Sequence, residues 1–311
     1  MSESITTIPP PFIDTIHRVF GDDGRAWLPR LPGILAQCRA KWKLSASVPC
    51  AAMSLNYLEF AVTAAGEPVA LKVGVPHSEL YTEMEALALY DGHRAVRLLD
   101  ADRELGALLL QRLRPGTMLW HLGDNARETR IAASILSALH VPAPERHGMP
   151  TFARWVQRAF YLTRTEWDPE ERMPRDLLDR AERAFHEIER TAPRTVVLHG
   201  DLHHENILYD ERSGWTAIDP KGVVGAPILD VGRFLQNQLP GSLPPADRET
   251  RVRERVNILS AEMGYTPEAV AASSLVDCVL SHCWSFEDEA LGNEWPLGIE
   301  LARLLCRLAD T

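Results

Sequence analysis

The chain has 311 residues, enough for about two domains at roughly 150 residues each, or for one large enzyme domain with two lobes. Hydrophobic residues make up 45% and charged residues 24%, which excludes wholesale disorder, collagen and coiled coil. The net charge of -10 repels nucleic acid and anionic membranes and attracts cationic small molecules. We therefore expect a small-molecule partner with positive charge, no nucleic acid and no membrane.

The cysteines and the N-terminus bear on the compartment. The five cysteines are scattered and have no CxxC spacing, so they predict neither a disulfide framework nor a zinc knuckle. Residues 1–11 lack a basic stretch followed by an apolar one, and no run approaches the ~18 apolar residues of a membrane span. These features favour a cytoplasmic protein, either a monomer or a homodimer.

Strand patterns dominate the first 112 residues after an N-terminal helical cap. Residues 12–43 read as helical pieces interrupted by Pro29 and Pro32. A strand at 53–62 places Leu58, Phe60 and Val62 on one face. Further strands are predicted at 68–75, 95–99 and 107–112, and a helix at 78–90 that stops at Asp91-Gly92. This pattern predicts a small antiparallel β-sheet with one helix.

Helical periodicity takes over beyond the break at Arg114-Pro115-Gly116. Apolar residues recur at helical spacing at 131–139, 151–166 and 174–191, and helices resume after Pro220. Between them, short apolar runs at 196–198, 206–209 and 215–218 flank polar turns. We therefore predict an α+β fold with two lobes, residues 1–112 and residues 113–311.

The densest polar cluster is His199-Gly-Asp-Leu-His-His-Glu-Asn206, and Asp219 follows another short apolar run. Phosphoryl transfer needs a carboxylate for the acceptor hydroxyl and oxygen ligands for Mg²⁺. We predict Asp201 as the catalytic base and Asn206 and Asp219 as magnesium ligands. The cluster therefore favours a kinase that uses ATP and Mg²⁺.

The spacing of five residues from Asp201 to Asn206 resembles the protein-kinase catalytic loop. The segments HGDLHHENIL and IDPKG resemble motifs of the aminoglycoside phosphotransferase family, in its streptomycin 6-kinase and hydroxyurea-phosphotransferase branch. This resemblance covers about residues 50–290 and implies a bilobal protein-kinase-like fold. It implies an ATP-dependent O-phosphotransferase that inactivates a streptomycin-like aminoglycoside, or alternatively a kinase for hydroxyurea or another small alcohol or amino alcohol.

The first lobe should then hold the nucleotide. Only four of the 33 Lys and Arg residues are lysines, and Lys72 lies inside the apolar run Val69-Ala-Leu-Lys-Val73. In a kinase-like lobe it would contact the α and β phosphates and pair with a helix glutamate. By the resemblance that partner is Glu83, with Glu85 as the alternative; a surface lysine on a sheet edge is the other interpretation.

The nucleotide-binding loop departs from protein kinases, because no GxGxxG or GxxxxGK[ST] occurs in the chain. The Ser54 hydroxyl and backbone N–H groups would have to meet the phosphates, although Ser54 and Asn56 are equally well plain turn residues. The backbone at Gln111 to Leu113 would form the hinge that binds the adenine edge.

An acceptor with guanidino or amino groups would pair with carboxylates and lie on an aromatic ring. We predict Trp284, Glu287 and Asp288 as acceptor residues; a core tryptophan followed by a solvated acidic turn is the alternative. Asp230 either braces the catalytic loop, as in relatives, or caps a helix.

Two functions from other classes stay open at this point. A metal-dependent hydrolase would take His199, Asp201, His203 and His204 as ligands, but it would leave Asn206 and Asp219 unexplained. We expect His203, His204 and Glu205 to be hydrogen-bonded supports instead. A catalytically silent kinase-like binding protein would not need the complete set of Lys72, Asp201, Asn206 and Asp219.

Overall fold

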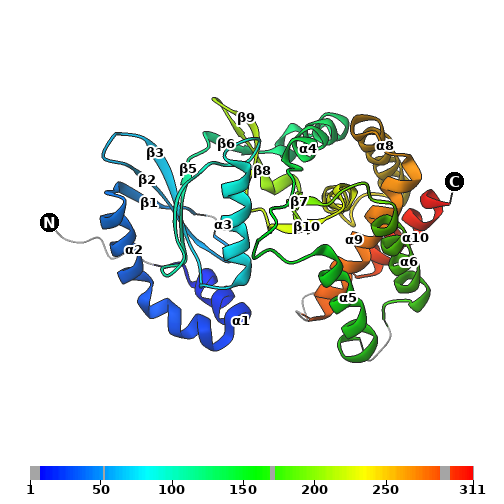
Figure 1. Cartoon of the computed structure of the whole chain (residues 1–311), viewed down its shortest axis with the longest axis horizontal. Coiled ribbons are helices and arrows are strands. Elements are labelled where there is room, and N and C mark those ends of the chain that lie inside the picture. Colours follow the sequence, from blue (N-terminus) through cyan, green and yellow to red (C-terminus); the bar gives the residue numbers. More distant parts are fainter. Residues whose placement is uncertain (1–7, 52, 169–171, 288–294, 311) are drawn as a thin grey trace. The chain divides into compact units, whose positions relative to one another are not determined.

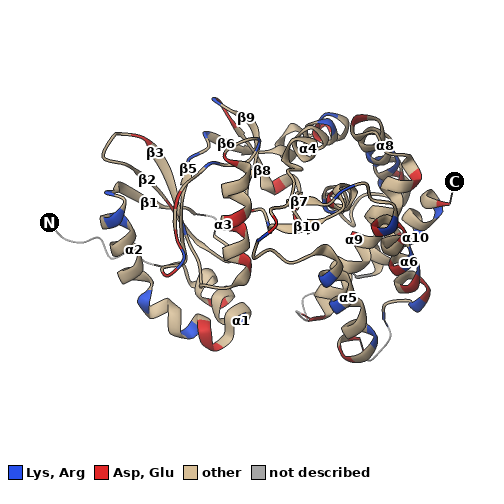
Figure 2. Ribbon diagram, in the orientation of Figure 1, with Lys and Arg blue, Asp and Glu red and all other residues tan. Residues whose placement is uncertain are grey.

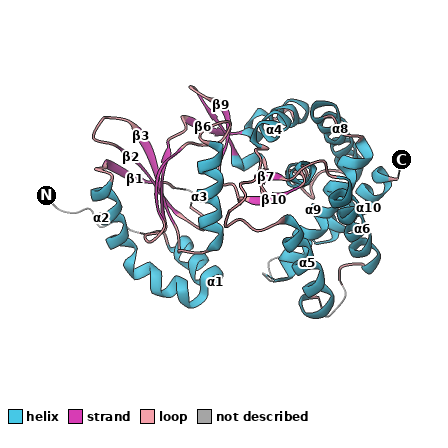
Figure 3. Ribbon diagram, viewed as in Figure 1, coloured by secondary structure: helices cyan, strands magenta, loops and turns pink. Residues whose placement is uncertain are grey.

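The computed structural model describes residues 8–51, 53–168, 172–287 and 295–310 (Figure 1). The chain forms two compact units. Unit one comprises Met1–Gly92 with Val96–Leu113, and unit two comprises His93–Ala95 with Arg114–Thr311. Strands concentrate in unit one and helices in unit two (Figure 3), which confirms the predicted α+β class.

Unit one is built on an antiparallel five-stranded sheet in the order β1-β2-β3-β5-β4. Its strands are β1 (Ser45–Pro49), β2 (Tyr57–Val62), β3 (Pro68–Val73), β4 (Leu98–Asp102) and β5 (Ala107–Gln111), and its helices are α1 (Pro10–Trp27), α2 (Leu31–Lys41) and α3 (Ser78–Tyr90). The prediction missed β1 and placed β4 three residues too early. The helix at 78–90 is confirmed, and Asp91 closes it in the left-handed conformation, with its N–H bonded to the Leu87 carbonyl.

The buried face of β2 is the opposite of what its apolar residues suggest. Tyr57, Glu59 and Ala61 are buried, whereas Leu58 and Phe60 are only partly buried. The reason lies in α2, where Arg39 donates two hydrogen bonds of 2.9 and 2.5 Å to the carboxylate of Glu59. A buried carboxylate is tolerable when such a bidentate partner satisfies it.

Truncation of Arg39 should destabilise unit one because it leaves the fully buried Glu59 carboxylate without its cation. We expect Arg39→Ala to lower the free energy of unfolding by about 3 kcal/mol in a urea titration. The double variant Arg39→Met/Glu59→Leu removes both charges and should stay within about 1 kcal/mol of the parent. An equal loss in both variants would show that packing, not charge, holds α2 on the sheet.

Unit two carries two small sheets among helices. Its strands are β6 (Pro115–Met118), β7 (Val196–Leu198), β8 (Ile207–Asp210), β9 (Gly214–Ala217) and β10 (Val223–Gly225), and its helices are α4 (Asn125–Leu139), α5 (Phe152–Leu162), α6 (Arg175–Thr191), α7 (Gly232–Gln236), α8 (Pro245–Met263), α9 (Pro267–Glu287) and α10 (Trp295–Ala309). The sheets have the orders β10-β7 and β6-β8-β9. Strands β6 and β10 were not predicted.

The helices of unit two surround α9. Among the described residues α9 alone is long and apolar enough to cross a membrane, but 67% of its apolar window is buried inside the structure. The core helices of globular proteins have the same properties. Acidic and basic residues are interspersed along α6 and α8 (Figure 2), which form ion pairs such as Arg253 with Glu249. The interior position of α9 therefore follows from the amphipathic helices around it.

Candidate active site

The segment predicted to carry the catalytic base, residues 199–206 and named the catalytic loop after that prediction, runs between β7 and β8 in unit two. Its entry is held by β10, which pairs antiparallel with β7, and by the Lys221 N–H, which donates to the His199 carbonyl at 2.7 Å. Gly200 has a φ of +78°, and a Cβ there would lie 2.9 Å from Val223. Only glycine fits both the left-handed backbone and this close approach.

Asp230 braces the loop from behind. Its buried carboxylate accepts hydrogen bonds from the N–H groups of His199 and Gly200, both at 2.8 Å, and lies 3.3 Å from His140 Nε2. Burial raises the pKa of Asp230, but His140 and the backbone donors outweigh it and leave that pKa below its usual value. Asp230 is therefore a fully satisfied anion that fixes the backbone immediately before Asp201.

Asn206 and Asp219 are brought together by the pairing of β8 with β9. Ile207 is the register partner of Ala217, and the Ile218 N–H donates to the Asn206 carbonyl at 2.9 Å. Asn206 Nδ2 donates to the Asp201 carbonyl at 3.0 Å, so the amide nitrogen is used and the oxygen remains for another partner. Asp219 follows with a φ of +57°. Amide and carboxylate oxygens are both ligands that suit Mg²⁺.

The histidines of the loop act as supports. The His199 Nε2 lies 2.9 Å from the Ile218 carbonyl, and its Nδ1 accepts from the Asp201 N–H. His204 is stacked on Phe234 and bonded through Nδ1 to Asn237. Burial is the main cause, and the positive charge of Arg255 the second, that lowers the pKa of His204 to about 3. Both rings are thus held neutral in fixed orientations.

This bonding removes the basis of the hydrolase hypothesis. Both ring nitrogens of His199 are engaged, as are those of His204, whose Nε2 faces Arg255 at 3.4 Å. His203 bonds through Nδ1 to Glu205 at 2.7 Å. No group of three or more His, Cys, Asp or Glu side chains in the described part of the chain is arranged to hold a metal ion.

In unit one, Lys72 and Glu83 form a buried ion pair. Lys72 Nζ lies 2.7 and 2.8 Å from the two Glu83 oxygens, and both side chains are nearly inaccessible to solvent. The alternative partner Glu85 instead lies 3.6 Å from Arg103. Lys72 is therefore not a surface lysine on a sheet edge, because its strand β3 lies at the centre of the sheet.

The other residues predicted to bind nucleotide lie in a loop and at a strand end of unit one. Ser54 is exposed in the loop between β1 and β2. Asn56, in the same loop, packs so closely on Gly74 that a Cβ there would collide with its amide oxygen. Gln111 ends β5, with its N–H bonded to the Arg97 carbonyl at 2.9 Å, and Leu113 ends unit one.

The predicted acceptor residue Trp284 meets a second tryptophan beside the catalytic loop. Its ring packs edge-to-face on Trp155 of α5, with centroids 5.3 Å apart. The Trp155 ring in turn approaches to 3.2 Å of the position a Cβ would take on Gly200. Both indoles are partly exposed. Trp284 is therefore separated from the catalytic loop by the Trp155 ring, and Trp155 itself contacts the loop at Gly200.

Glu287 is held next to this aromatic pair by an ion pair with Arg158 at 2.6 Å, which joins α9 to α5. Asp288, the third predicted acceptor residue, lies outside the described residues.

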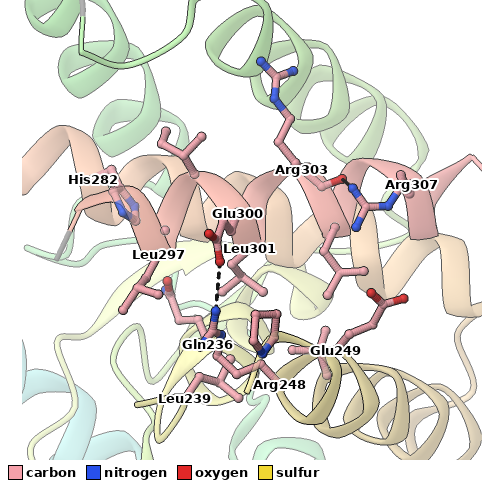
Figure 4. A pocket seen from close by; sticks show the side chains of 15 residues that line it. Gln236, Leu239, Arg248, Glu249, His282, Leu297, Glu300, Leu301, Arg303 and Arg307 are labelled. Atoms are coloured by element: carbon pink, nitrogen blue, oxygen red, sulfur yellow. Dashed lines mark hydrogen bonds and ion pairs between the residues drawn. The ribbon is translucent and has the colours of Figure 1, made fainter. Parts of the chain in front are cut away.

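A cavity of about 550 Å³ opens elsewhere in unit two, between α8, α9 and α10 (Figure 4). Its charged lining includes Arg248, Arg303 and Arg307, and Arg248 pairs with Glu300 at 2.9 Å. Glu249 and Glu300 also line it, so the three arginines leave a lining of net positive charge, which repels a cationic ligand. No site residue predicted from the sequence is among the lining residues. The cavity therefore does not fit the expected acceptor.

The model of the family described as aminoglycoside/hydroxyurea antibiotic resistance kinase matches residues 41–289. The chain belongs to this kinase family. It is 30% identical to a streptomycin 6-kinase of Streptomyces griseus, over 90% of this chain and 91% of that protein. It is 31% identical to a hydroxyurea phosphotransferase of Kitasatospora aureofaciens, over 92% of this chain and 82% of that protein.

Solved structures agree on the fold of the kinase. The choline kinase LicA from Streptococcus pneumoniae superposes with a TM-score of 0.62 at 15% identity, over 91% of this chain and 100% of LicA. This likeness confirms the predicted protein-kinase-like fold, and membership of the kinase family confirms the predicted phosphotransferase activity.

Three residues near the loop of the kinase escaped the sequence analysis: Trp155, Arg233 and Asp277. Arg233 Nε lies 3.1 Å from Asp201 Oδ1, and Asp277 lies behind Arg233. One signal for Asp277 was present, because it is a lone carboxylate in the apolar run of α9. Trp155 and Arg233 carry no comparable signal, since their partners are distant in sequence.

Removal of the Asp230 charge should loosen the catalytic loop. Asn keeps one acceptor oxygen but sets an NH₂ group against a backbone donor, so Asp230→Asn should lower the free energy of unfolding by about 3 kcal/mol at pH 7. The pKa of Asp230 is lowered by folding, so its stabilisation is present at neutral pH and lost as the pH falls below its unfolded pKa of about 3.9.

Urea titrations at several pH values measure both effects. Asp124→Asn is the matched control, because Asp124 caps α4 through the Arg127 N–H and Asn caps helices equally well. A loss for Asp230→Asn no larger than that of the control would contradict the bracing role.

Proposed function

We propose that the enzyme transfers the γ-phosphoryl group of ATP to a hydroxyl of a cationic small molecule, and that a streptomycin-like aminoglycoside is the acceptor. The observation that supports this most directly is the pairing of Asn206 with the strand end that leads to Asp219, beside the loop that carries Asp201. Phosphorylation of such an antibiotic in the cytoplasm would protect the cell. The free state of all five cysteines is consistent with a reducing compartment.

In the proposed reaction Asp201 orients the acceptor hydroxyl and takes its proton. The hydroxyl oxygen forms a bond to the γ-phosphorus as the bond from that phosphorus to the bridging oxygen breaks, and ADP leaves with the electron pair. Two charged residues outside the loop support this role. Asp230 fixes the backbone before Asp201, and Arg233 contacts the Asp201 carboxylate. No covalent intermediate on the protein is needed.

Asn206 and Asp219 are the proposed magnesium ligands. When bound, Mg²⁺ would neutralise charge that develops on the phosphate oxygens. Asn206 supports this role because its amide nitrogen is anchored on the Asp201 carbonyl, so that the amide oxygen points to the remaining side. The nearby histidines are too firmly bonded to compete as ligands.

The nucleotide is assigned to residues 1–112 and the acceptor to residues 113–311. Lys72, held by Glu83, supplies the cation for the α and β phosphates, while the Ser54 loop and the Gln111–Leu113 backbone contact the phosphates and the base. ATP use is supported by the nucleotide-bound relatives of this fold, which include LicA in complex with AMP.

The acceptor is assigned to the aromatic pair Trp155 and Trp284, with Glu287 beside it. An indole face attracts a cation, and desolvated contacts of this kind contribute up to about 2 kcal/mol. The pair reaches the catalytic loop at Gly200, next to the proposed base. The hydroxyurea phosphotransferase relative keeps a small neutral acceptor as the second candidate.

The activity is tested by measuring ADP formation with streptomycin, other aminoglycosides, hydroxyurea and small amino alcohols in magnesium buffer. We expect fastest turnover with a streptomycin-like acceptor and a phosphorylated product in the mass spectrum. Asp201→Asn should lower kcat by about 10³-fold and leave Mg-ATP binding unchanged, because the base is lost while the shape is kept.

Each outcome separates the proposals. Turnover of hydroxyurea alone would move the assignment to the alternative acceptor. Full activity of Asp201→Asn would show that Asp201 is not the base. If none of these acceptors gave ADP, the aminoglycoside assignment would be contradicted.

Loss of either indole should weaken acceptor binding and spare the nucleotide. We expect Trp155→Ala and Trp284→Ala each to raise the KM for the acceptor by about tenfold, which corresponds to the loss of about 1.4 kcal/mol, with little change in the KM for ATP. Trp120→Ala is the control, since Trp120 is 43% exposed and its ring stacks on His121 and not on either member of the pair. Acceptor KM values that stay within twofold of the parent in both variants would place the acceptor elsewhere.

A further inference from the structure

Arg233 lies between two carboxylates, one of them the proposed base. It is the second residue of α7, and its Nε is 3.1 Å from Asp201 Oδ1 and 3.9 Å from Asp277 Oδ2. The side chain is 23% exposed, but the Nε atom itself is shielded from solvent and has no hydrogen-bond geometry toward any described group. The contact with Asp201 is therefore an attraction between charges at close range, from which water is excluded on the Nε side.

Asp277 is placed to hold Arg233 and has no access to substrate. It is 4% exposed within α9, and its Oδ2 accepts a hydrogen bond from the amide of Gln236, which also bonds to Ser281. Gly232 allows α7 to approach α9 this closely, because a Cβ there would collide with the Asp277 side chain. The backbone, the amide and the carboxylate thus fix the position from which Arg233 reaches Asp201.

The charges favour this arrangement over its alternatives. Burial tends to lower the pKa of Arg233, but Asp277 and then Asp201 outweigh it, so the guanidinium stays charged. Without Arg233, the two carboxylates would repel each other, and Asp201 would rotate away from Asp277. Attraction to Arg233 instead keeps the Asp201 carboxylate turned toward the guanidinium.

We propose that Arg233 is a positioning residue that, anchored by Asp277, holds the Asp201 carboxylate in the orientation required to receive the acceptor proton. The inference rests on the proposed function, because it takes Asp201 as the base. Arg233 needs no contact with nucleotide or acceptor in this role, so its loss should affect turnover and spare nucleotide binding.

The test is Arg233→Ala in the full chain, with chemical rescue. A misplaced base costs on the order of 10²-fold in rate, so we expect kcat to fall by about that factor while the KM for ATP stays within twofold. Guanidinium at non-denaturing concentrations should enter the space left by the side chain and restore at least a tenth of the lost activity with saturation. Urea, which has a similar shape but no charge, should restore none.

Arg164→Ala is the matched control. Arg164 is 24% exposed and also contacts two carboxylates, Asp179 and Glu182, each at 2.8 Å, but these belong to α6. Its kcat should match the parent enzyme with and without guanidinium. The parent enzyme treated with guanidinium corrects for any competition at the acceptor site.

Asp277→Asn keeps the inference testable if Arg233→Ala fails to fold. Asn can still accept from Gln236, so the packing is kept while the anchor loses its charge. We expect kcat to fall about tenfold with unchanged Mg-ATP binding. A kcat within twofold of the parent in a folded Arg233 or Asp277 variant, or equal rescue by urea and guanidinium, would overturn the inference. Loss of turnover in Asp201→Asn together with such a result would leave the proposed function intact.

Discussion

Two backbone N–H groups of the catalytic loop, at His199 and Gly200, point to one buried carboxylate. The geometry of the site depends on this interaction, because Asp230 fixes the chain directly before Asp201, where glycine permits a left-handed turn that no other residue would fit. A buried anion is costly unless all of its oxygens are used, and His140 completes the set. Asp230 therefore stabilises the loop in one conformation, while Asp201, the proposed base, stays partly exposed.

A second buried charge supports the loop from the other side. Arg255 of α8 is fully inaccessible, and it donates to the carbonyls of Phe234, Leu235 and Asn237 and to the side chain of Asn125. This segment then holds His204 by stacking and by a hydrogen bond from its ring. Since the Nδ1 of His204 donates to Asn237, its Nε2 is left to accept from Arg255. Polar groups of this kind favour a single structure when every one of them is bonded.

Features that depend on neighbouring residues could be predicted from the sequence, whereas features that depend on contacts between distant segments could not. The loop at 199–206 and Asp219 stand out in the sequence because they lie within one continuous segment, and the structure shows that its short strands β8 and β9 pair with each other. The roles of these residues stay predictions. The exposed face of β2 was misjudged, since the burial of Glu59 depends on Arg39, which is twenty residues earlier. Arg233 and Trp155 were missed for the same reason: each is ordinary within its own helix, and its partners near the loop lie in distant segments. Asp277 did carry a local signal, as a lone carboxylate in the apolar run of α9, but its partner Arg233 lies in α7.

The charge around the loop also bears on the choice of acceptor. Burial raises the pKa of Asp277, Arg233 opposes this, and the nearby Asp201 and Asp230 add to it, so these acidic groups influence one another through space. A triphosphate would add further negative charge, and a divalent cation together with Lys72 would offset it. A cationic acceptor gains from the remaining negative potential, whereas neutral hydroxyurea gains little. In the proposed site, the acidic groups around Arg233 therefore also favour an amino or guanidino compound as the substrate.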